Sequence, residues 1–281
     1  VSASHLKQWL PALSNSNAQG EYYLTDIIAM AVDHGLSVTV SQPLNPFEVQ
    51  GVNNRLQLAE LERWYQRQQA ERLMTEGASL ADPARIEVRG ELIIGNDLWI
   101  DVNAVFEGRV SLGNNVVIGP NCVIKDATIA DGAEIKANSV IEGAVVGANA
   151  QIGPFARLRP GTELAANTKV GNFVETKKAV VGEGSKINHL SYVGDASLGR
   201  NVNVGAGTIT CNYDGVNKHQ TVLGDGVFVG SNTSLVAPVN VAEQATIGAG
   251  STITRDISEG ELAVARGKQR NIAGWERPKK A

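Results

Sequence analysis

A small aliphatic residue, often followed by glycine, recurs at every sixth position between about residues 92 and 258. This period is typical of a hexapeptide-repeat parallel β-helix, in which each unit forms one short strand and a corner. Three units close a triangular coil and stack each aliphatic side chain on its counterpart one coil away. The matching pairs are Ile94-Gly95, Leu112-Gly113, Ile118-Gly119, Val146-Gly147, Ile152-Gly153, Val170-Gly171, Leu198-Gly199, Val204-Gly205, Leu223-Gly224, Val229-Gly230 and Ile247-Gly248.

The composition fits a solenoid and excludes several classes of partner. Aromatic residues make up 5% of the 281 residues, and 30 glycines are available for tight corners. The formal charge of -4 gives no reason to expect nucleic acid or a membrane as partner. The two cysteines, Cys122 and Cys211, lie far apart in the sequence, so we expect a reducing, cytoplasmic setting.

Four segments follow from the pattern. Residues 1–54 lack the period and predict a small α/β piece, with a helix near 24–32 and a strand over 37–40. Apolar residues at helical spacing predict a linker helix over 55–76. The β-helix is expected over 77–260, followed by a basic tail over 261–281.

The repeat is interrupted twice. Thirteen residues separate Ile209 from Leu223, so about seven of them must leave the prism as a loop. A smaller slip is expected at 176–180, where five residues stand for six. Both interruptions lie near the densest group of ionisable residues in the repeat, which makes this region the candidate site: Arg157, Arg159, Glu175, Lys177, Lys178, Lys186 and His189.

His189 is the candidate general base, since an imidazole of ordinary pKa near 6.5 accepts protons at neutral pH. The alternative is a solvated surface histidine. Glu175 would raise its basicity, and Tyr192 would orient a substrate. Arg159 and Lys177 offer a fork and an ammonium to a phosphate or carboxylate, unless they only form a solvated basic face.

The projecting loop and the tail carry further polar groups. Asn212, Tyr213 and Lys218 lie on the loop and would reach a neighbouring chain, although such loops are often only turns. Cys211 and His219 are interpreted as spectators rather than as nucleophile or base. The tail would hold the phosphates of a nucleotide-like cofactor or simply be a solubilising segment; its cations are Arg266, Lys268, Arg270, Arg277, Lys279 and Lys280.

Three strings resemble a known family. They are GNFVETKK at 171–178, NHLSYVGD at 188–195 and GAGTITCNYDG at 205–215. They resemble the bacterial bifunctional glucosamine-1-phosphate N-acetyltransferase / N-acetylglucosamine-1-phosphate uridyltransferase, and the likeness extends over the whole chain. It implies a left-handed β-helix that transfers acetyl from acetyl-CoA to glucosamine 1-phosphate, in the synthesis of UDP-N-acetylglucosamine for peptidoglycan and lipopolysaccharide. It also implies a homotrimer whose sites lie between subunits.

The resemblance assigns roles residue by residue. His189 becomes the general base, with Glu175 supporting it. The acceptor pocket would comprise Arg159, Lys177, Tyr192, Asn203 and Lys218. The acetyl-CoA channel would comprise Ala206, Asn212, Tyr213, Ser231, Ala249 and Arg266. Ser231 and Asn212 are both open as oxyanion donors.

The chain departs from the family pattern at its start. The glycine-rich nucleotide-binding opening of the uridyltransferase half is missing, and residues 1–54 resemble only the final part of that half. Asn53 matches a position that helps to hold magnesium, but its partner ligands are absent. We therefore expect acetyl transfer to be retained and uridyl transfer, with its magnesium, to be lost.

Other functions are also considered. A metal-dependent lyase of the carbonic anhydrase type on this fold would need three imidazoles, whereas His189 and His219 are the only two in the repeat. A purely structural solenoid would predict an unbroken repeat with a bland surface. A working uridyltransferase would need the missing nucleotide-binding half.

Overall fold

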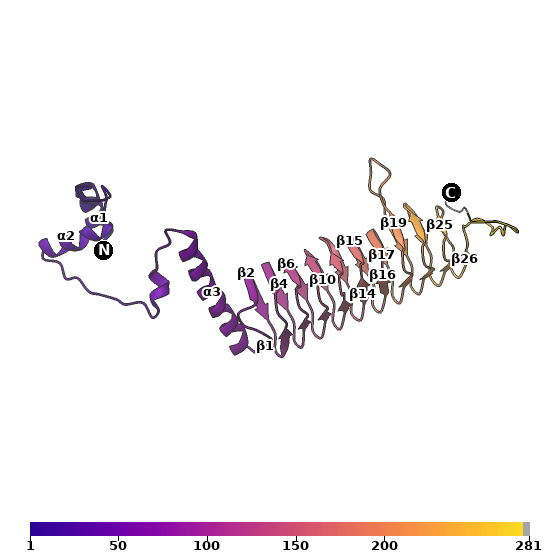
Figure 1. Cartoon of the computed structure of the whole chain (residues 1–281), viewed down its shortest axis with the longest axis horizontal. Coiled ribbons are helices and arrows are strands. Elements are labelled where there is room, and N and C mark those ends of the chain that lie inside the picture. The colour runs from indigo at the N-terminus through magenta and orange to yellow at the C-terminus, as the bar shows by residue number, and fades with distance from the viewer. Residues whose placement is uncertain (278–281) are drawn as a thin grey trace. The chain divides into compact units, whose positions relative to one another are not determined.

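The computed structural model describes residues 1–277 and divides the chain into two compact units. The first is Val1–Leu61 and the second is Glu62–Ala281. Figure 1 shows a small helical part and a long stack of coils. Within the described chain, no helix is both long and apolar enough to cross a bilayer.

The first unit is built from short helices. The helix expected near 24–32 is confirmed, but the strand expected over 37–40 is wrong, since these residues form irregular chain. A single strand is unstable without a neighbour to take up its backbone hydrogen bonds, and the structure describes none within residues 1–54. The elements are α1 (Ala3–Trp9), η1 (Leu10–Ala12), η2 (Leu24–Asp26), α2 (Ile27–Asp33) and η3 (Pro46–Val49).

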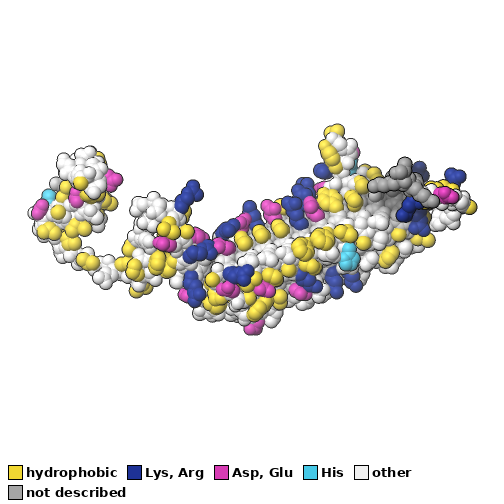
Figure 2. Space-filling model, viewed as in Figure 1, with side chains coloured by type: hydrophobic (Ala, Val, Ile, Leu, Met, Phe, Trp, Pro, Cys, Tyr) yellow, Lys and Arg dark blue, Asp and Glu magenta, His cyan; other side chains and the backbone are white. Residues whose placement is uncertain are grey.

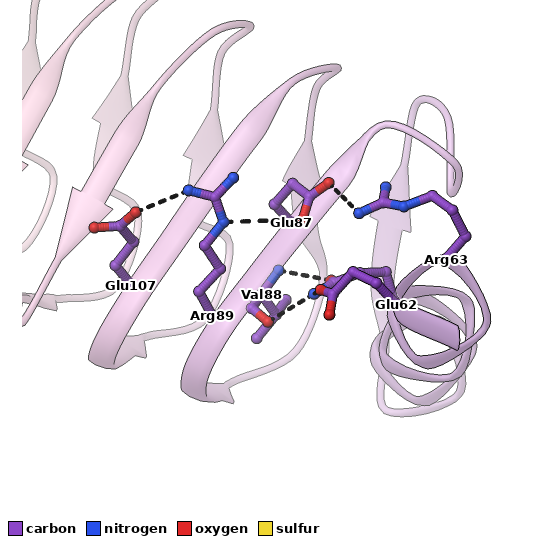
Figure 3. Close-up of polar contacts among 7 residues, drawn as sticks. Glu62, Arg63, Glu87, Val88, Arg89 and Glu107 are labelled. Atoms are coloured by element: carbon purple, nitrogen blue, oxygen red, sulfur yellow. Dashed lines mark hydrogen bonds and ion pairs between the residues drawn. The ribbon is translucent and has the colours of Figure 1, made fainter. Parts of the chain in front are cut away.

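Helix α3 (Arg55–Thr75) begins in the first unit and ends in the second. Its portion from Glu62 onward covers the open end of the β-helix. The Gln66 side chain donates to the Val88 carbonyl at 2.9 Å and accepts from the Val88 amide at 2.8 Å. Ala70 and Leu73 are fully buried, and Arg63 pairs with Glu87 at 2.6 Å (Figure 3). The helix thereby caps the first coil, whose backbone would otherwise lack a partner.

The second unit is a left-handed parallel β-helix with three faces, as the sequence predicted. Every strand pairing in it is parallel, and each strand bonds to the equivalent strand of the next coil. Face 1 is an 11-stranded sheet: β1 (Ala78–Leu80), β3 (Leu98–Ile100), β5 (Val117–Ile118), β8 (Glu134–Ile135), β11 (Gln151–Ile152), β14 (Lys169–Asn172), β16 (Lys186–His189), β18 (Asn203–Val204), β21 (Phe228–Val229), β24 (Thr246–Ile247) and β26 (Leu262–Ala263).

The remaining strands form a 15-stranded sheet that bends through faces 2 and 3. Four long strands cross the bend and belong to both faces: β2 (Ile86–Ile94), β4 (Ala104–Leu112), β15 (Glu175–Val181) and β17 (Tyr192–Leu198). Face 2 is completed by β6 (Val123–Lys125), β9 (Val140–Glu142), β12 (Arg157–Leu158), β19 (Ile209–Cys211), β22 (Ser234–Val236) and β25 (Thr252–Ile253). Face 3 is completed by β7 (Thr128–Ile129), β10 (Ala144–Val146), β13 (Thr162–Leu164), β20 (Thr221–Leu223) and β23 (Val239–Val241).

The core consists of stacked aliphatic columns inside the prism. Ile135, Ile152 and Val170 stack in register on face 1, and none of the three is exposed to solvent. Ile135 pairs with a residue 17 positions on, and Ile152 with one 18 positions on. Several coils are therefore one residue shorter than the 18 residues of three full hexads. The slip expected at 176–180 is one of these short coils rather than a special feature. Short corners absorb these differences while the buried columns stay aligned.

The long insertion leaves the prism as predicted. Asn203 pairs with Phe228, which lies 25 positions on, instead of the usual 17 or 18. The extra residues form a hairpin between β19 and β20 that projects from the stack (Figure 1). Cys211 precedes this hairpin and is half-buried, whereas Cys122 is buried in the prism, where burial raises the pKa of its thiol.

Candidate active site

His189 lies at the end of β16, where the chain turns from face 1 to face 2. Its side chain is exposed, and the next strand, β17, begins at Tyr192. The sequence placed the imidazole outside the prism, and the structure agrees. A hollow of about 240 Å³ adjoins the ring and is lined by Lys136, Gln151, Gly153, Pro154, Lys169, Val170, Gly171, Asn172, Asn188 and His189.

Residues expected to line the acetyl-CoA channel form one column with His189, one residue in each successive coil. The amide of Gly207 donates to the His189 carbonyl at 3.3 Å, and Asn232 donates to Ala206 at 2.8 Å. The next coils continue the column through Ser231 and Ala249, which accept from Gly250 and from the Arg266 guanidinium. Stacked strands are about 4.8 Å apart, so His189 and Arg266, four coils apart, are separated by roughly 19 Å along the edge. The column is His189, Ala206, Ser231, Ala249 and Arg266.

The imidazole of His189 is held by Asn172. Nδ1 of His189 lies 2.7 Å from Oδ1 of Asn172, which occupies the same position one coil earlier. Glu175, which the sequence suggested as the group that tunes His189, pairs instead with Arg159 at 2.7 Å. Asn172 was missed by sequence reasoning; the signal was its place in the Gly171-Asn172 corner, 17 residues before His189.

The expected acceptor residues gather on face 2. Glu175 is in register with Tyr192, and Lys177 with Gly194 on the same pair of strands. The Arg159 amide donates to the Thr176 carbonyl at 2.9 Å, which places Arg159 one coil before Lys177. The side chains of Arg159, Lys177 and Tyr192 are partly exposed. Asn203 is not among them, because it lies on face 1 in register with Lys186.

The projecting loop is ordered by local polar contacts. Asp214 accepts from the amides of Asn217 and Val216 and pairs with His219 at 2.6 Å, and these hydrogen bonds hold the pKa of Asp214 well below its usual range. The Lys218 ammonium lies 4.3 Å from the centre of the Tyr213 ring.

At the base of the loop, the buried Asn212 amide donates to the Asp195 carboxylate. Ser231, the other residue open as an oxyanion donor, is exposed. His219 is paired within the loop, in line with its interpretation as a loop residue.

Asn53 belongs to the first unit, where its amide donates to the Gln57 side chain at 2.8 Å. Across residues 1–277, no group of three or more His, Cys, Asp or Glu side chains is placed to hold a metal ion. Of the expected basic tail, Lys279 and Lys280 lie outside the described residues, and Arg266, Lys268 and Arg270 are exposed.

Two family descriptions match the repeat region. The GMPPB C-terminal domain matches residues 88–165, and the hexapeptide repeat of succinyl-transferase matches residues 220–255. Among solved structures, a UDP-N-acetylglucosamine acyltransferase from Bacteroides fragilis gives a TM-score of 0.45 at 18% identity, covering 63% of this chain and 68% of that chain. A likeness at this level carries no argument about activity.

Curated relatives match the chain from end to end. The bifunctional protein GlmU of Marinobacter nauticus is 99% identical over 281 residues, all of this chain and 62% of that protein. The protein of the same name from Stutzerimonas stutzeri is 61% identical over 280 residues, again 62% of its length. The chain thus spans a little under two thirds of the curated relatives that it matches, and it belongs to the GlmU family.

Proposed function

We propose that the chain transfers acetyl from acetyl-CoA to the amine of glucosamine 1-phosphate and releases CoA, as a step toward UDP-N-acetylglucosamine. The observation that carries this proposal is the column of small residues that leads along one edge of the prism to an exposed imidazole. The end-to-end match to bifunctional GlmU proteins supports it.

His189 would act as the general base. The acceptor amine is largely protonated in water, and only its free form attacks the thioester carbonyl. As the new C–N bond forms, the imidazole takes the proton from nitrogen, and the C–S bond then breaks to release the CoA thiolate. The carbonyl oxygen gains charge during attack, and the exposed Ser231 hydroxyl is the donor best free to meet it, because the Asn212 amide is engaged by Asp195.

Charge complementarity indicates which basic residues would bind the phosphate groups of the two substrates. Arg159 and Lys177 on face 2 would hold the sugar phosphate, and Tyr192 would orient the sugar. Arg266, at the far end of the column from His189, would meet the phosphates of CoA. Pairing with Glu175 pre-orients the Arg159 guanidinium without burying it.

The acceptor pocket would be shared between subunits. Asn203 and Arg159 lie on different faces of a convex prism, so one chain cannot bring both side chains into one concave pocket. We propose a homotrimer in which neighbouring copies supply Asn203 and the projecting loop with Tyr213 and Lys218. The exposed position of Tyr213 and Lys218 on that loop supports this arrangement.

Uridyl transfer is not proposed for this chain. The loss of uridyl transfer and of its magnesium, expected from the sequence, stays a prediction. Cytoplasmic location, suggested by cysteine usage, stays a prediction.

The test is CoA-thiol release from acetyl-CoA with glucosamine 1-phosphate as acceptor, measured for the chain, for His189→Ala and for His34→Ala. General bases typically contribute 10²- to 10⁴-fold, so we expect His189→Ala to lose about that much kcat. His34→Ala should keep full activity, because His34 is exposed and its contacts with Met30 and Trp9 lie within the first unit. An active His189→Ala variant would contradict the assignment. UTP-dependent pyrophosphate release, assayed alongside, should be absent.

A further inference from the structure

We propose that Asn172 is the positioning residue for His189: its side-chain oxygen accepts a hydrogen bond from Nδ1–H and so keeps Nε2 free to act as base. This inference rests on the proposed acetyl transfer. It adds a residue that acts through His189 without touching substrate.

The backbone holds the two residues in register. β14 and β16 are paired over Lys169 with Lys186 and Asn172 with His189, and the amide of Leu190 donates to the Asn172 carbonyl at 3.1 Å. A Cβ added at Gly171 would overlap the Asn188 carbonyl, so glycine is needed for the two coils to stack this closely. The backbone register thus places the Asn172 side chain within reach of the His189 ring, and the two side chains make the 2.7 Å contact.

The orientation of the amide decides the chemistry. With the oxygen toward the ring, Nδ1 carries the proton and Nε2 has a free lone pair. With the nitrogen toward the ring, Nδ1 would have to accept, the proton would sit on Nε2, and the neutral histidine would have no lone pair to offer the substrate. An acetyltransferase that uses His189 as base in the proposed way requires the first arrangement.

A neutral partner also suits the charges around the ring. Lys136, which pairs with Glu134 at 3.8 Å, and Lys169 line the hollow beside His189, and Lys186 lies on the same strand as His189. Glu175 is paired with Arg159. An amide oxygen orients the ring without adding the negative charge that a carboxylate would bring.

The test combines nitrogen NMR of the His189 ring with the pH dependence of kcat/KM. We expect the wild-type ring to carry its proton on Nδ1, and Asn172→Ala to lose this preference. The same variant should lose about 10- to 100-fold in kcat, as the outer partners of oriented histidines typically do, with KM for acetyl-CoA unchanged.

Asn172→Asp gives the sharper measurement. A carboxylate at this position stabilises the imidazolium, so the His189 pKa should rise by about one unit and the acidic limb of kcat/KM should move up in pH by the same amount. Activity should recover above the raised pKa.

Asn138→Asp is the matched control. It adds the same charge at a corner two coils earlier, retains an acceptor for Asn121 and suits the φ of 60° there. Asn138 lies three coils before His189, so the added charge is roughly 14 Å from the ring along the stack, beyond the screening length of about 8 Å at physiological ionic strength, and the pH profile should stay unchanged.

The outcomes separate the two proposals. A proton on Nε2 of the wild-type ring, in an enzyme that needs His189, would overturn the role of Asn172 and leave acetyl transfer standing. An unshifted profile in Asn172→Asp would overturn it as well. A proton on Nδ1 in a chain that transfers no acetyl group would sink the proposed function and, with it, the catalytic role of the contact, while the tautomer itself would stand.

Discussion

The stacked coils and the segments outside the stack satisfy their backbone and their apolar side chains in different ways. In the coils, Ile152 is fully buried between its counterparts on the coils before and after it. In the first unit, Ile28 is 52% exposed, and Trp9 is the buried residue of its helices. The projecting loop relies on the carboxylate of Asp214 instead of apolar contacts.

The difference shows how a repeat makes its own core. Each coil needs only its neighbours, so stability accumulates coil by coil and the ends require a cap, here α3 through Gln66. A segment without the repeat buries little surface of its own. Mutations there should therefore lower the free energy of unfolding only slightly, whereas mutations in the buried columns should lower it strongly. Figure 2 shows charges of both signs spread along the outside of the coils, where single substitutions should matter least.

The largest effect is expected from Ile152→Ala. Removing this buried side chain leaves a cavity between two coils and should cost about 2 to 5 kcal/mol of unfolding free energy. Ile28→Ala in the first unit should cost less than about 0.5 kcal/mol, because the side chain is half in water already. Urea titrations of both variants measure the difference. Equal costs would mean that the first unit has a core comparable to that of the coils.

A smaller effect is expected at the corner next to the site. Leu190 has a φ of 51° and is 62% exposed, so a bulky side chain sits in a backbone conformation that suits asparagine or glycine. Leu190→Asn should increase the free energy of unfolding by roughly 0.5 to 1 kcal/mol and so raise the melting temperature. Ile209→Asn, on an exposed position of strand β19, should lower it instead. A destabilised Leu190→Asn would show that the leucine is covered in the working assembly.

The loop should respond to acid without affecting the coils. The pKa of Asp214 is lowered by hydrogen bonds from Asn217, His219 and Val216. A depressed folded-state pKa contributes order that is present above the usual carboxyl pKa, near 3.9, and lost as the pH falls through the folded value. Amide NMR signals of residues 213–219 should thus stay constant from neutrality down to about pH 4 and broaden only in stronger acid. Broadening near pH 6 would point to His219 instead.

The smallest effect is expected from deleting residues 1–54. Gln66, Ala70 and Leu73, which cap the first coil, all lie beyond the deletion. The thermal transition of the coils should therefore shift by less than a degree or two, corresponding to under about 0.5 kcal/mol. Calorimetry on the full and shortened chains measures it. A large drop would show that the capping helix needs the first unit.

Much of the fold was predictable because the repeat is local and periodic. A branched aliphatic residue every sixth position, with Gly or Asn at corners, predicted three stacked faces, and Ile135, Ile152 and Val170 stack as expected. The insertion after Ile209 was also predictable, since a coil cannot absorb extra residues. The strand expected over 37–40 failed, because residue preference alone cannot supply a pairing partner.

The candidate site was only partly predictable. The residues near the interruptions of the repeat marked His189 as the candidate base, and the family resemblance assigned the residues from Ala206 to Arg266, which the structure stacks along one edge with it. Only the tertiary structure decided which side chains meet across coils: Asn172 rather than Glu175 contacts His189, and Glu175 pairs with Arg159. The physical reason is that the period determines which edge a residue occupies, whereas hydrogen bonds depend on coil lengths of 17 or 18 residues that bring particular neighbours within about 3 Å.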